Sequence, residues 1–243
     1  MRSPLDELIA ARPAFGGSTE AEQLALITHQ SLRKGNIDWL EVGAGDGRNL
    51  RYLLSELSAG RTFRVVALEP AAPAGRIEGA TWFNLRVEDY RPNSQFDWMN
   101  VRHSAYYMDD PVAEMGRLSS LLRPDGSIAL THWSRDCVLH RLHVAICGDQ
   151  VDGPTSGIEE IAQRLTSVGG LAVSNVERLE TLLNVENVAE DDKLASALYE
   201  LARRGRTPLN LVANRAERVR DMLGAMPDPA RRLNGVMLIR PAR

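Results

Sequence analysis

The sequence is poor in cysteine and in long apolar runs, and each shortage excludes a class of protein. Two cysteines, Cys137 and Cys147, are too few for a disulfide framework, so a reducing compartment is the simpler expectation. No stretch approaches the roughly 20 consecutive apolar residues that a membrane-spanning helix needs. The chain begins Met-Arg-Ser-Pro-Leu-Asp-Glu-Leu, with acids where a signal peptide would carry its apolar segment. These absences predict a cytoplasmic protein with no membrane partner.

Lysine is also scarce, and the positive charge is unevenly distributed. Only Lys34 and Lys193 are lysines, so nearly all basic residues are arginines. The 29 basic and 32 acidic residues give a formal net charge of −3, which argues against a dedicated nucleic-acid binder. Residues 203–243 nevertheless hold ten arginines against three acids, and this local +7 leaves −10 for residues 1–202.

The arginine-rich segment has two interpretations. It could form an RNA-binding face, but no aromatic residues for base stacking are interleaved with the arginines. Arg218 with Asp221, and Glu217 with Arg220, are three residues apart and would pair on a helix. We therefore expect a solvated face, or one attracted to the acidic run 186–192, and no nucleic-acid partner.

The 243 residues allow one large domain or two small ones, at roughly 100–200 residues per domain. Apolar periodicity predicts strands at 37–42, 63–68, 81–87, 96–101, 127–133, within 171–183 and at 235–239, and helices at 18–35, 50–57, 112–122, 157–168, 189–204 and 213–223. Strands that alternate with helices indicate a parallel sheet covered on both faces. We predict one domain, composed of an N-terminal helical lid (1–36), a cofactor-binding core (37–183), a helical insertion (184–230) and the last strand (231–243).

A glycine-rich turn lies between a predicted strand and a predicted helix. Gly43, Gly45 and Gly47 permit positive φ angles and let the backbone approach a ligand at the carboxyl end of a sheet. Glu69 ends the next predicted strand, 22 residues after Gly47, a distance that suits hydrogen bonds from both hydroxyls of a ribose. A tight turn alone would explain the glycines. Together with the strand, the helix and the acid, they predict a nucleoside site.

Two further acids indicate which nucleoside would bind. Glu41 precedes the glycines, and Asp46 lies between the last two. A phosphate-binding turn would present a bare helix N-terminus, with no acid against the pyrophosphate. These carboxylates would repel a diphosphate but suit a ligand with an amino group and a sulfonium charge. They favour S-adenosyl-L-methionine over a nicotinamide cofactor.

Several stretches between residues 37 and 133 resemble, in order, the motifs of class I S-adenosylmethionine-dependent methyltransferases. They are Glu41-x-Gly43-x-Gly45-x-Gly47, Glu69, Val87-Glu88-Asp89 and Arg123-Pro124-Asp125-Gly126. The resemblance implies a Rossmann-like, doubly wound α/β fold with a seven-stranded, mostly parallel sheet, an antiparallel last strand and a helical lid. It also implies that the glycine turn cradles the methionine part, that Glu69 holds the ribose and that Glu88 flanks the adenine. The implied cofactor-binding residues are Glu41, Gly43, Gly45, Asp46, Gly47, Glu69, Pro70, Val87, Glu88, Asp89 and Arg102.

A narrower resemblance is to the small-molecule methyltransferases similar to histamine N-methyltransferase. It rests on Ser18-Thr19-Glu20, on Val101–Tyr107 with Asp109 and Pro111, and on Leu233-Asn234-Gly235. It implies that Glu20 is a carboxylate for a substrate amine and that Asn234 faces the substrate. The sequence departs from that group at His103, where the group has glutamine, and in the detail of the glycine turn. Histamine therefore does not carry over as the substrate.

Methyl transfer needs a nucleophile about 3 Å from the methyl carbon, with water excluded. An amine nucleophile must be neutral, so a nearby proton acceptor helps. The segment after the fourth strand lies beside the methyl group in this fold, so we expect His103, Tyr106 and Tyr107 to be catalytic. A histidine with a reference pKa near 6.5 suits a general base, although a hydrogen-bonded packing role is the alternative. The expected substrate-binding residues are Glu20, His103, Tyr107, Trp133 and Asn234.

Cys137, His140, His143 and Cys147 follow helical spacing and could suggest zinc. Four such ligands along one helix span about 15 Å and cannot meet at one ion, so we expect no metal. The predicted function is S-adenosylmethionine-dependent methylation of a small molecule at an amine nitrogen. The alternatives are O-methylation of a carboxylate or hydroxyl of a secondary metabolite, and a methyltransferase-like binding protein without turnover.

Overall fold

The computed structural model describes residues 15–16, 20–71, 77–147, 157–183, 185–203, 214–229 and 231–242. Within these residues, one sheet contains β1 (Phe15–Gly16), β2 (Gly35–Val42), β3 (Arg61–Leu68), β4 (Thr81–Phe83), β5 (Phe96–Arg102), β6 (Leu122–Trp133), β7 (Leu171–Val173), β8 (Glu177–Leu183) and β9 (Arg231–Pro241). The helices are α2 (Glu20–Ser31), α3 (Arg48–Glu56), α4 (Pro111–Ser119), α5 (Val138–Cys147), α6 (Ile158–Thr166), α7 (Val185–Glu190), α8 (Asp192–Arg203) and α9 (Arg215–Ala225).

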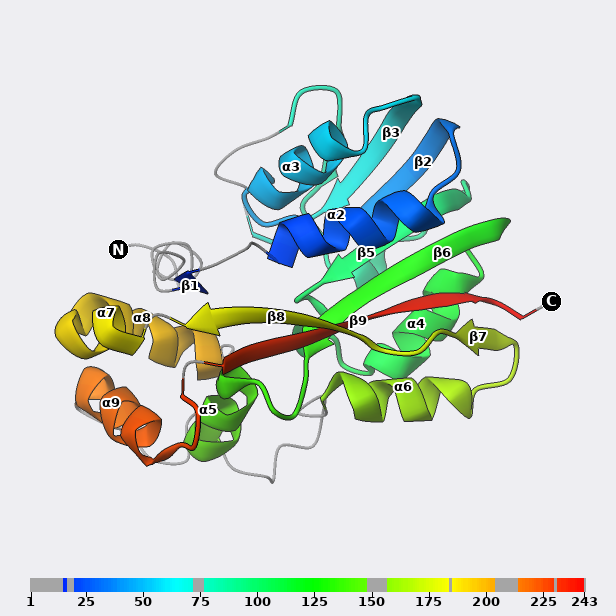
Figure 1. Ribbon diagram of the computed structural model, residues 1–243. Helices are drawn as coiled ribbons and strands as arrows, with labels where there is room; N and C mark the ends of the chain where they lie inside the picture. The colour runs from blue at the N-terminus through cyan, green and yellow to red at the C-terminus, as the bar shows by residue number, and fades with distance from the viewer. Residues whose placement is uncertain are drawn as a thin grey trace.

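The sheet has the order β1-β8-β9-β6-β5-β2-β3-β4, and β7 pairs with β9 (Figure 1). Strands β2 to β6 pair in parallel, whereas β9 runs antiparallel to β6, β7 and β8. This confirms the predicted α/β fold with an antiparallel last strand, to which β1 and β7 are short additions. The chain moves outward from β2 to β4 and then returns to β5 on the other side of β2. Ligands in such sheets bind beyond the carboxyl ends of the strands at this point of reversal.

Helices cover both faces of the sheet because the inner strands are apolar on both faces. Alternate side chains of a strand point to opposite faces. Trp39 of β2 packs in one apolar cluster with α2 and α3, and Leu40 packs in another with α4 and α6. Burial on both faces is typical of parallel strands. No helix in the described residues is long and apolar enough to cross a membrane.

A third apolar cluster joins the helices α5, α7, α8 and α9 to the carboxyl end of the sheet. In Figure 1 these helices gather where β8 ends and β9 begins. Tyr106 and Trp133, which lie just beyond β5 and at the end of β6, belong to the same cluster. The helices that follow β8 therefore pack against the sheet end where a ligand is expected.

Ion pairs occupy the opposite end of the sheet. Asp97 of β5 contacts Arg33 at 2.9 Å and Arg123 at 3.0 Å. Asp38 of β2 contacts Arg64 at 2.6 Å and also pairs with Arg123. These contacts explain why Arg123, in the stretch that resembles a methyltransferase motif, lies at the amino ends of the strands, away from the glycine turn.

Several predicted boundaries were wrong. Helix α4 ends at Ser119 rather than at 122, and the Arg-Pro-Asp-Gly stretch belongs to β6, which pairs with Phe96 of β5 through an irregular register. The strand predicted at 81–87 ends at Phe83. The helix predicted at 189–204 is two helices, because the Asp191 side chain accepts hydrogen bonds from the first amides of α8. Ser18 and Thr19, at the start of the helix predicted at 18–35, and the segment 1–14 lie outside the described residues.

Two arginines of α9 pair with acids outside their own helix. Arg220 pairs with Asp192 of α8 at 2.6 Å, not with Glu217, whose carboxylate accepts a hydrogen bond from Asn214. Arg215 pairs with the buried Glu200 of α8. The expected attraction between this segment and the acidic run 186–192 is thus observed at Asp192.

The glycine turn and the loop after β5 are in close contact, and this contact predicts the cost of a substitution. A Cβ at Gly43, where φ is +71°, would lie 2.0 Å from Ser104 Oγ, whereas a Cβ at Gly45, where φ is +57°, would meet nothing within 4 Å. Gly43→Ala should therefore lower the free energy of unfolding by about 2 to 4 kcal/mol, and Gly45→Ala by about 1 kcal/mol. Urea denaturation measures both values, and equal losses would contradict this packing.

Candidate functional site

The glycine turn connects β2 to α3 in a left-handed backbone conformation. Gly43, Gly45 and Gly47 have φ angles of +71°, +57° and +75°. The amides of Gly43 and Ala44 donate to the Leu68 carbonyl at 2.9 and 3.0 Å, which fixes the turn against the end of β3. The predicted need for glycine is confirmed, because other residues rarely adopt these angles.

Glu69 lies directly beside this turn. Its carboxylate accepts hydrogen bonds from the Gly45 amide at 2.8 Å and from the Ala71 amide at 3.1 Å. The side chain is buried, and the residue follows the last residue of β3. A carboxylate held at the end of the second parallel strand can accept from both hydroxyls of a ribose.

The other predicted cofactor residues are distributed around the turn and the neighbouring strand end. Asp46 pairs with Arg48 at 2.6 Å, and Glu88 pairs with Arg86 at 2.7 Å. Glu88 lies in a short 3-10 helix, Val87–Asp89, whose Val87 is buried. Pro70 is exposed beside Glu69.

Glu41 is buried at the end of β2, and its hydrogen-bond partners among the described residues are neutral groups. Trp39 Nε1 donates to Oε2 at 2.9 Å, and Asn100 Nδ2 contacts Oε1 at 2.9 Å and Oε2 at 3.1 Å. Burial raises the pKa of Glu41 to about 7, although these hydrogen bonds and the charge of Arg102 oppose the shift.

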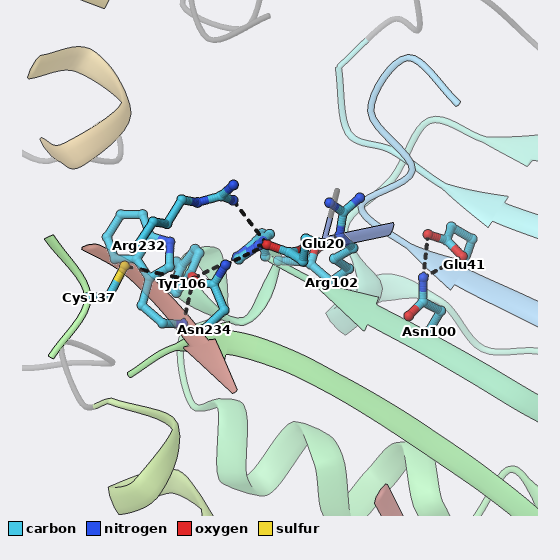
Figure 2. A network of polar contacts seen from close by, with 11 residues as sticks. Glu20, Glu41, Asn100, Arg102, Tyr106, Cys137, Arg232 and Asn234 are labelled. Carbon is cyan, nitrogen blue, oxygen red and sulfur yellow. Dashed lines mark hydrogen bonds and ion pairs between the residues drawn. The ribbon is translucent and has the colours of Figure 1, made fainter. Parts of the chain in front are cut away.

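A second buried carboxylate, Glu20, lies at the start of α2 and is 3% exposed. Arg102 Nε donates to it at 2.6 Å, Arg232 at 3.0 Å, and Asn234 Nδ2 also donates to it (Figure 2). His103 Nε2 lies 2.9 Å from Oε1 and 3.0 Å from Oε2. The carboxylate therefore connects the start of α2, the end of β5 and the start of β9.

The surroundings keep Glu20 ionised. Burial alone would raise the pKa of this carboxyl, but Arg102, His103 and Arg232 hold it well below its usual range. Breaking such a buried pair by removing one partner is strongly destabilising.

His103 joins Glu20 to Tyr106. Burial lowers the pKa of His103, and Arg102 and Arg232 lower it further, while Glu20 opposes the shift. Because the histidine is neutral and Glu20 can only accept, Nε2 carries the proton. Nδ1 then accepts from the Tyr106 hydroxyl at 2.8 Å, and that hydroxyl accepts from the Trp133 amide at 2.9 Å. One assignment of protons satisfies the whole chain.

The structure brings most of the predicted substrate residues together. Asn234 of β9 lies opposite Trp133 of β6, and its side chain contacts both Glu20 and, at 3.9 Å, the Cys137 thiol (Figure 2). Tyr107 lies at the edge of this group: the residue is 51% exposed, and its ring centre is 6.4 Å from that of Tyr106.

No cluster of histidine, cysteine or acidic side chains in the described residues could hold a metal ion. Cys137 and Cys147 are both reduced and buried. His143 of α5 bonds to the Ala202 carbonyl of α8 at 2.7 Å, which is a packing role.

Asn100 and Arg232 belong to the site but were not predicted from the sequence. Asn100 is a polar residue in a buried strand, opposite Glu41 in the parallel register, so a polar position in each of two adjacent strands was the available signal. Arg232 precedes Asn234 by two residues and so shares its strand face. Nothing in the local sequence connects Arg232 to Glu20, which is 212 residues away.

These residues fit S-adenosylmethionine. The space beside Gly45 is open, and Glu69 at the end of β3 suits a ribose. Arg102 uses only Nε among the described residues, so its two Nη groups can donate to a carboxylate. Figure 2 shows Arg102 between Glu20 and the Glu41–Asn100 pair. A glycine turn at the reversal point of a mostly parallel sheet, with acids beside it, is typical of a nucleoside-binding site in a Rossmann-like fold.

Comparison with known proteins assigns the class. Residues 18–184 match the family model described as the methyltransferase domain, and the chain belongs to this family. The protein is therefore a class I methyltransferase that uses S-adenosylmethionine. No curated protein sequence matches the chain.

Solved structures share the fold at low sequence identity. The YcgJ protein of Bacillus subtilis has a TM-score of 0.59 and 16% identity, covering 91% of this chain and 99% of that one. The 1,6-didemethyltoxoflavin-N1-methyltransferase of Burkholderia thailandensis, bound to its substrate and S-adenosylhomocysteine, has a TM-score of 0.54 and 16% identity, covering 93% and 79%. A plantazolicin methyltransferase bound to S-adenosylhomocysteine has a TM-score of 0.54 and 12% identity, covering 98% and 85%.

The Glu20 cluster predicts how stability depends on pH. A carboxyl whose pKa is depressed on folding stabilises the protein above its unfolded pKa of about 4.3, and this contribution is lost as the pH falls toward the folded pKa. Glu20→Gln should lower the free energy of unfolding at pH 7 by about 3 to 5 kcal/mol and flatten its fall between pH 7 and pH 3. Chemical denaturation at several pH values measures this.

The matched control is Glu22→Gln, an exposed position on the same turn of α2. This change should alter stability by less than about 0.5 kcal/mol and leave the pH dependence unchanged. A Glu20→Gln protein that keeps the wild-type pH dependence would contradict the role assigned to the cluster.

Proposed function

We propose that the protein methylates a small molecule at an amine nitrogen. The observation that carries this proposal is the neutral His103 at the carboxyl end of β5, connected to an ionised Glu20 on one side and to a tyrosine hydroxyl on the other. This arrangement can accept a proton from a nucleophile without presenting a fixed positive charge. In this proposal the chain belongs with the small-molecule methyltransferases that are similar to histamine N-methyltransferase.

In this proposal, residues around the glycine turn hold the methyl donor. Glu69 binds the ribose, Arg102 binds the methionine carboxylate through its Nη groups, and Gly43, Gly45 and Gly47 provide the backbone cradle. Asp46, Pro70 and the Val87–Asp89 helix border the same ligand. When bound, S-adenosylmethionine supplies a methyl group that is already activated by the sulfonium.

Residues of the protein then accept and transfer the proton of the amine. Tyr106 Oη accepts the proton that the amine releases while its own proton moves to His103 Nδ1. The resulting imidazolium is stabilised by Glu20, 2.9 Å from Nε2. Glu20 thus acts through His103, because its carboxylate already contacts four side chains. Trp133, Asn234 and the half-exposed Tyr107 would border the substrate.

A second candidate is O-methylation of a carboxylate or hydroxyl, and one observation favours it. Arg102 and Arg232 both contact the single carboxylate of Glu20, so the immediate cluster is cationic when His103 is neutral. A cationic surface attracts an anionic substrate group rather than an ammonium. A binding protein without turnover is the third candidate, which the same assay tests.

The partners proposed are a small-molecule substrate and no nucleic acid. Support for the second point comes from the arginines near the C-terminus, since Arg215, Arg220 and Arg232 are bound to acids of this chain. Two structural neighbours support a small-molecule substrate. One is named for N1-methylation of 1,6-didemethyltoxoflavin, and the other is bound to desmethyl plantazolicin analogues in related structures.

The proposal is tested with S-adenosylmethionine labelled in the methyl group and a panel of heteroaromatic and aliphatic amines, matched with carboxylic acids and phenols. We expect labelled N-methyl products, identified by mass spectrometry. His103→Gln should lower kcat by about 10² to 10⁴-fold with a smaller change in KM. Because burial lowers the pKa of His103, wild-type activity should stay level as the pH falls through the ordinary histidine range and decline only at lower pH.

The matched control is His29→Gln, the same change at an exposed histidine of α2, which should leave kcat unchanged. Labelled esters or ethers in place of amine products would select the second candidate. Binding of S-adenosylmethionine with no labelled product from either half of the panel would select the third. A His103→Gln protein with wild-type kcat and pH profile would remove His103 from the mechanism.

A further inference from the structure

The unusual feature beside the glycine turn is the protonation state of the buried Glu41 carboxyl. This carboxyl is 3% exposed and lies two residues before Gly43. In the part of the chain that the structure describes, no guanidinium or ammonium pairs with it, and its hydrogen-bond partners are the indole of Trp39 and the amide of Asn100. It differs in this respect from Glu20, which two guanidinium groups contact.

We infer that Glu41 carries a proton in a large fraction of the cofactor-free enzyme and releases it when the cationic cofactor binds. The proton leaves as Glu41-COOH becomes the carboxylate, and the buffer takes it up. Affinity for S-adenosylmethionine would then rise with pH. This inference rests on the cofactor assigned above and on no choice of substrate.

The balance between the two states of Glu41 is close. Removing a carboxylate from water without a paired charge favours the neutral acid, whereas donated N–H bonds favour the anion. Here burial is the larger influence and raises the pKa to about 7, so a modest added charge decides the state. A ligand with an ammonium and a sulfonium group supplies such a charge.

Asn100 can serve Glu41 in either state. Its Nδ2 now donates to the carboxylate, and its buried Oδ1 has no hydrogen-bond partner within the part of the chain that the structure describes. Since no hydrogen bond holds Oδ1, the amide can rotate and let Oδ1 accept the O–H of protonated Glu41. The oxygen and nitrogen of an amide are assigned from such networks, so both orientations belong to the same site.

Among the described residues, the charged groups near Glu41 make no ion pair with it. Arg102 of β5 is the charged group that acts on Glu41, but its Nε is bound to Glu20 of α2. Strand β3 places Ala67 beside Glu41 in the parallel register. In the glycine turn, Asp46 pairs with Arg48. Loss or gain of a proton in this pH range is therefore assigned to Glu41 itself.

Linkage makes this effect reciprocal: a cation that favours ionised Glu41 binds more tightly as the pH rises. S-adenosylmethionine carries one more positive charge than S-adenosylhomocysteine. The ratio of the affinity for S-adenosylmethionine to the affinity for S-adenosylhomocysteine should therefore also rise with pH. Glu41 would thus contribute to discrimination between the methyl donor and the product.

The test is calorimetric titration of the full chain with S-adenosylmethionine at pH 6, 7 and 8, in buffers of different ionisation enthalpy. The wild type should release about half a proton per site at pH 7 and nearly one at pH 6. Its affinity should rise about tenfold between pH 6 and pH 8. Glu41→Gln keeps the acceptor for Trp39 and Asn100 but cannot ionise, so it should show neither effect.

The ligand's own amino group can also exchange a proton, but it does so in both proteins, so the difference between wild type and Glu41→Gln isolates Glu41. Equal proton release from the two proteins would overturn the inference while leaving the cofactor assignment intact. No binding to the wild type would instead contradict the cofactor assignment. If Glu41→Gln does not fold, infrared difference spectra of the wild type decide, because binding must remove the carbonyl band of a protonated carboxylic acid.

Discussion

The site depends on one buried carboxylate. Glu20 is the first residue of α2. Its carboxylate contacts Arg102 and His103 at the end of β5. It also contacts Arg232 and Asn234 at the start of β9. Three segments that are far apart in the sequence therefore meet at a single charge. Because a buried charge must keep its partners, this interaction sets the direction in which His103 and Arg102 point. His103, whose φ of +52° is uncommon for a residue other than glycine, is held in place by the same contacts.

The two buried acids of the site have different states because their partners differ. Glu20 is contacted by two guanidinium groups and stays ionised, while the hydrogen-bond donors to Glu41 among the described residues are neutral and its pKa is about 7. Arg102 lies between them, and its positive charge acts to lower the pKa of both acids (Figure 2). Environments that separate the pKa values of neighbouring groups are a recurrent basis for acid–base function. We propose that one acid supports proton transfer near the substrate and that the other responds to the binding of the cofactor.

The sequence alone predicted the parts of the site that are local. The glycine turn and Glu69 were identified because each is defined by its position relative to a strand end, and the alternation of apolar segments predicted the α/β fold. Partners across the fold were missed, since nothing near Arg232 or Asn100 indicates which acid it meets. Helix α4 was predicted too long because apolar periodicity continues into β6, where strand pairing prevails over helical preference. The direct substrate contact expected of Glu20 stays a prediction, and the contacts of its carboxylate favour an indirect role.

A crystal structure with bound S-adenosylhomocysteine would show whether the carboxyl ends of β2, β3 and β5 form one S-adenosylmethionine site. Both oxygens of Glu69 should lie within hydrogen-bond distance of the ribose hydroxyls, and an Nη group of Arg102 should contact the carboxylate of the ligand. The hydrogen bonds between Glu20 and His103, and between His103 and Tyr106, should persist. A nucleoside bound elsewhere, or a ribose that does not contact Glu69, would contradict the account.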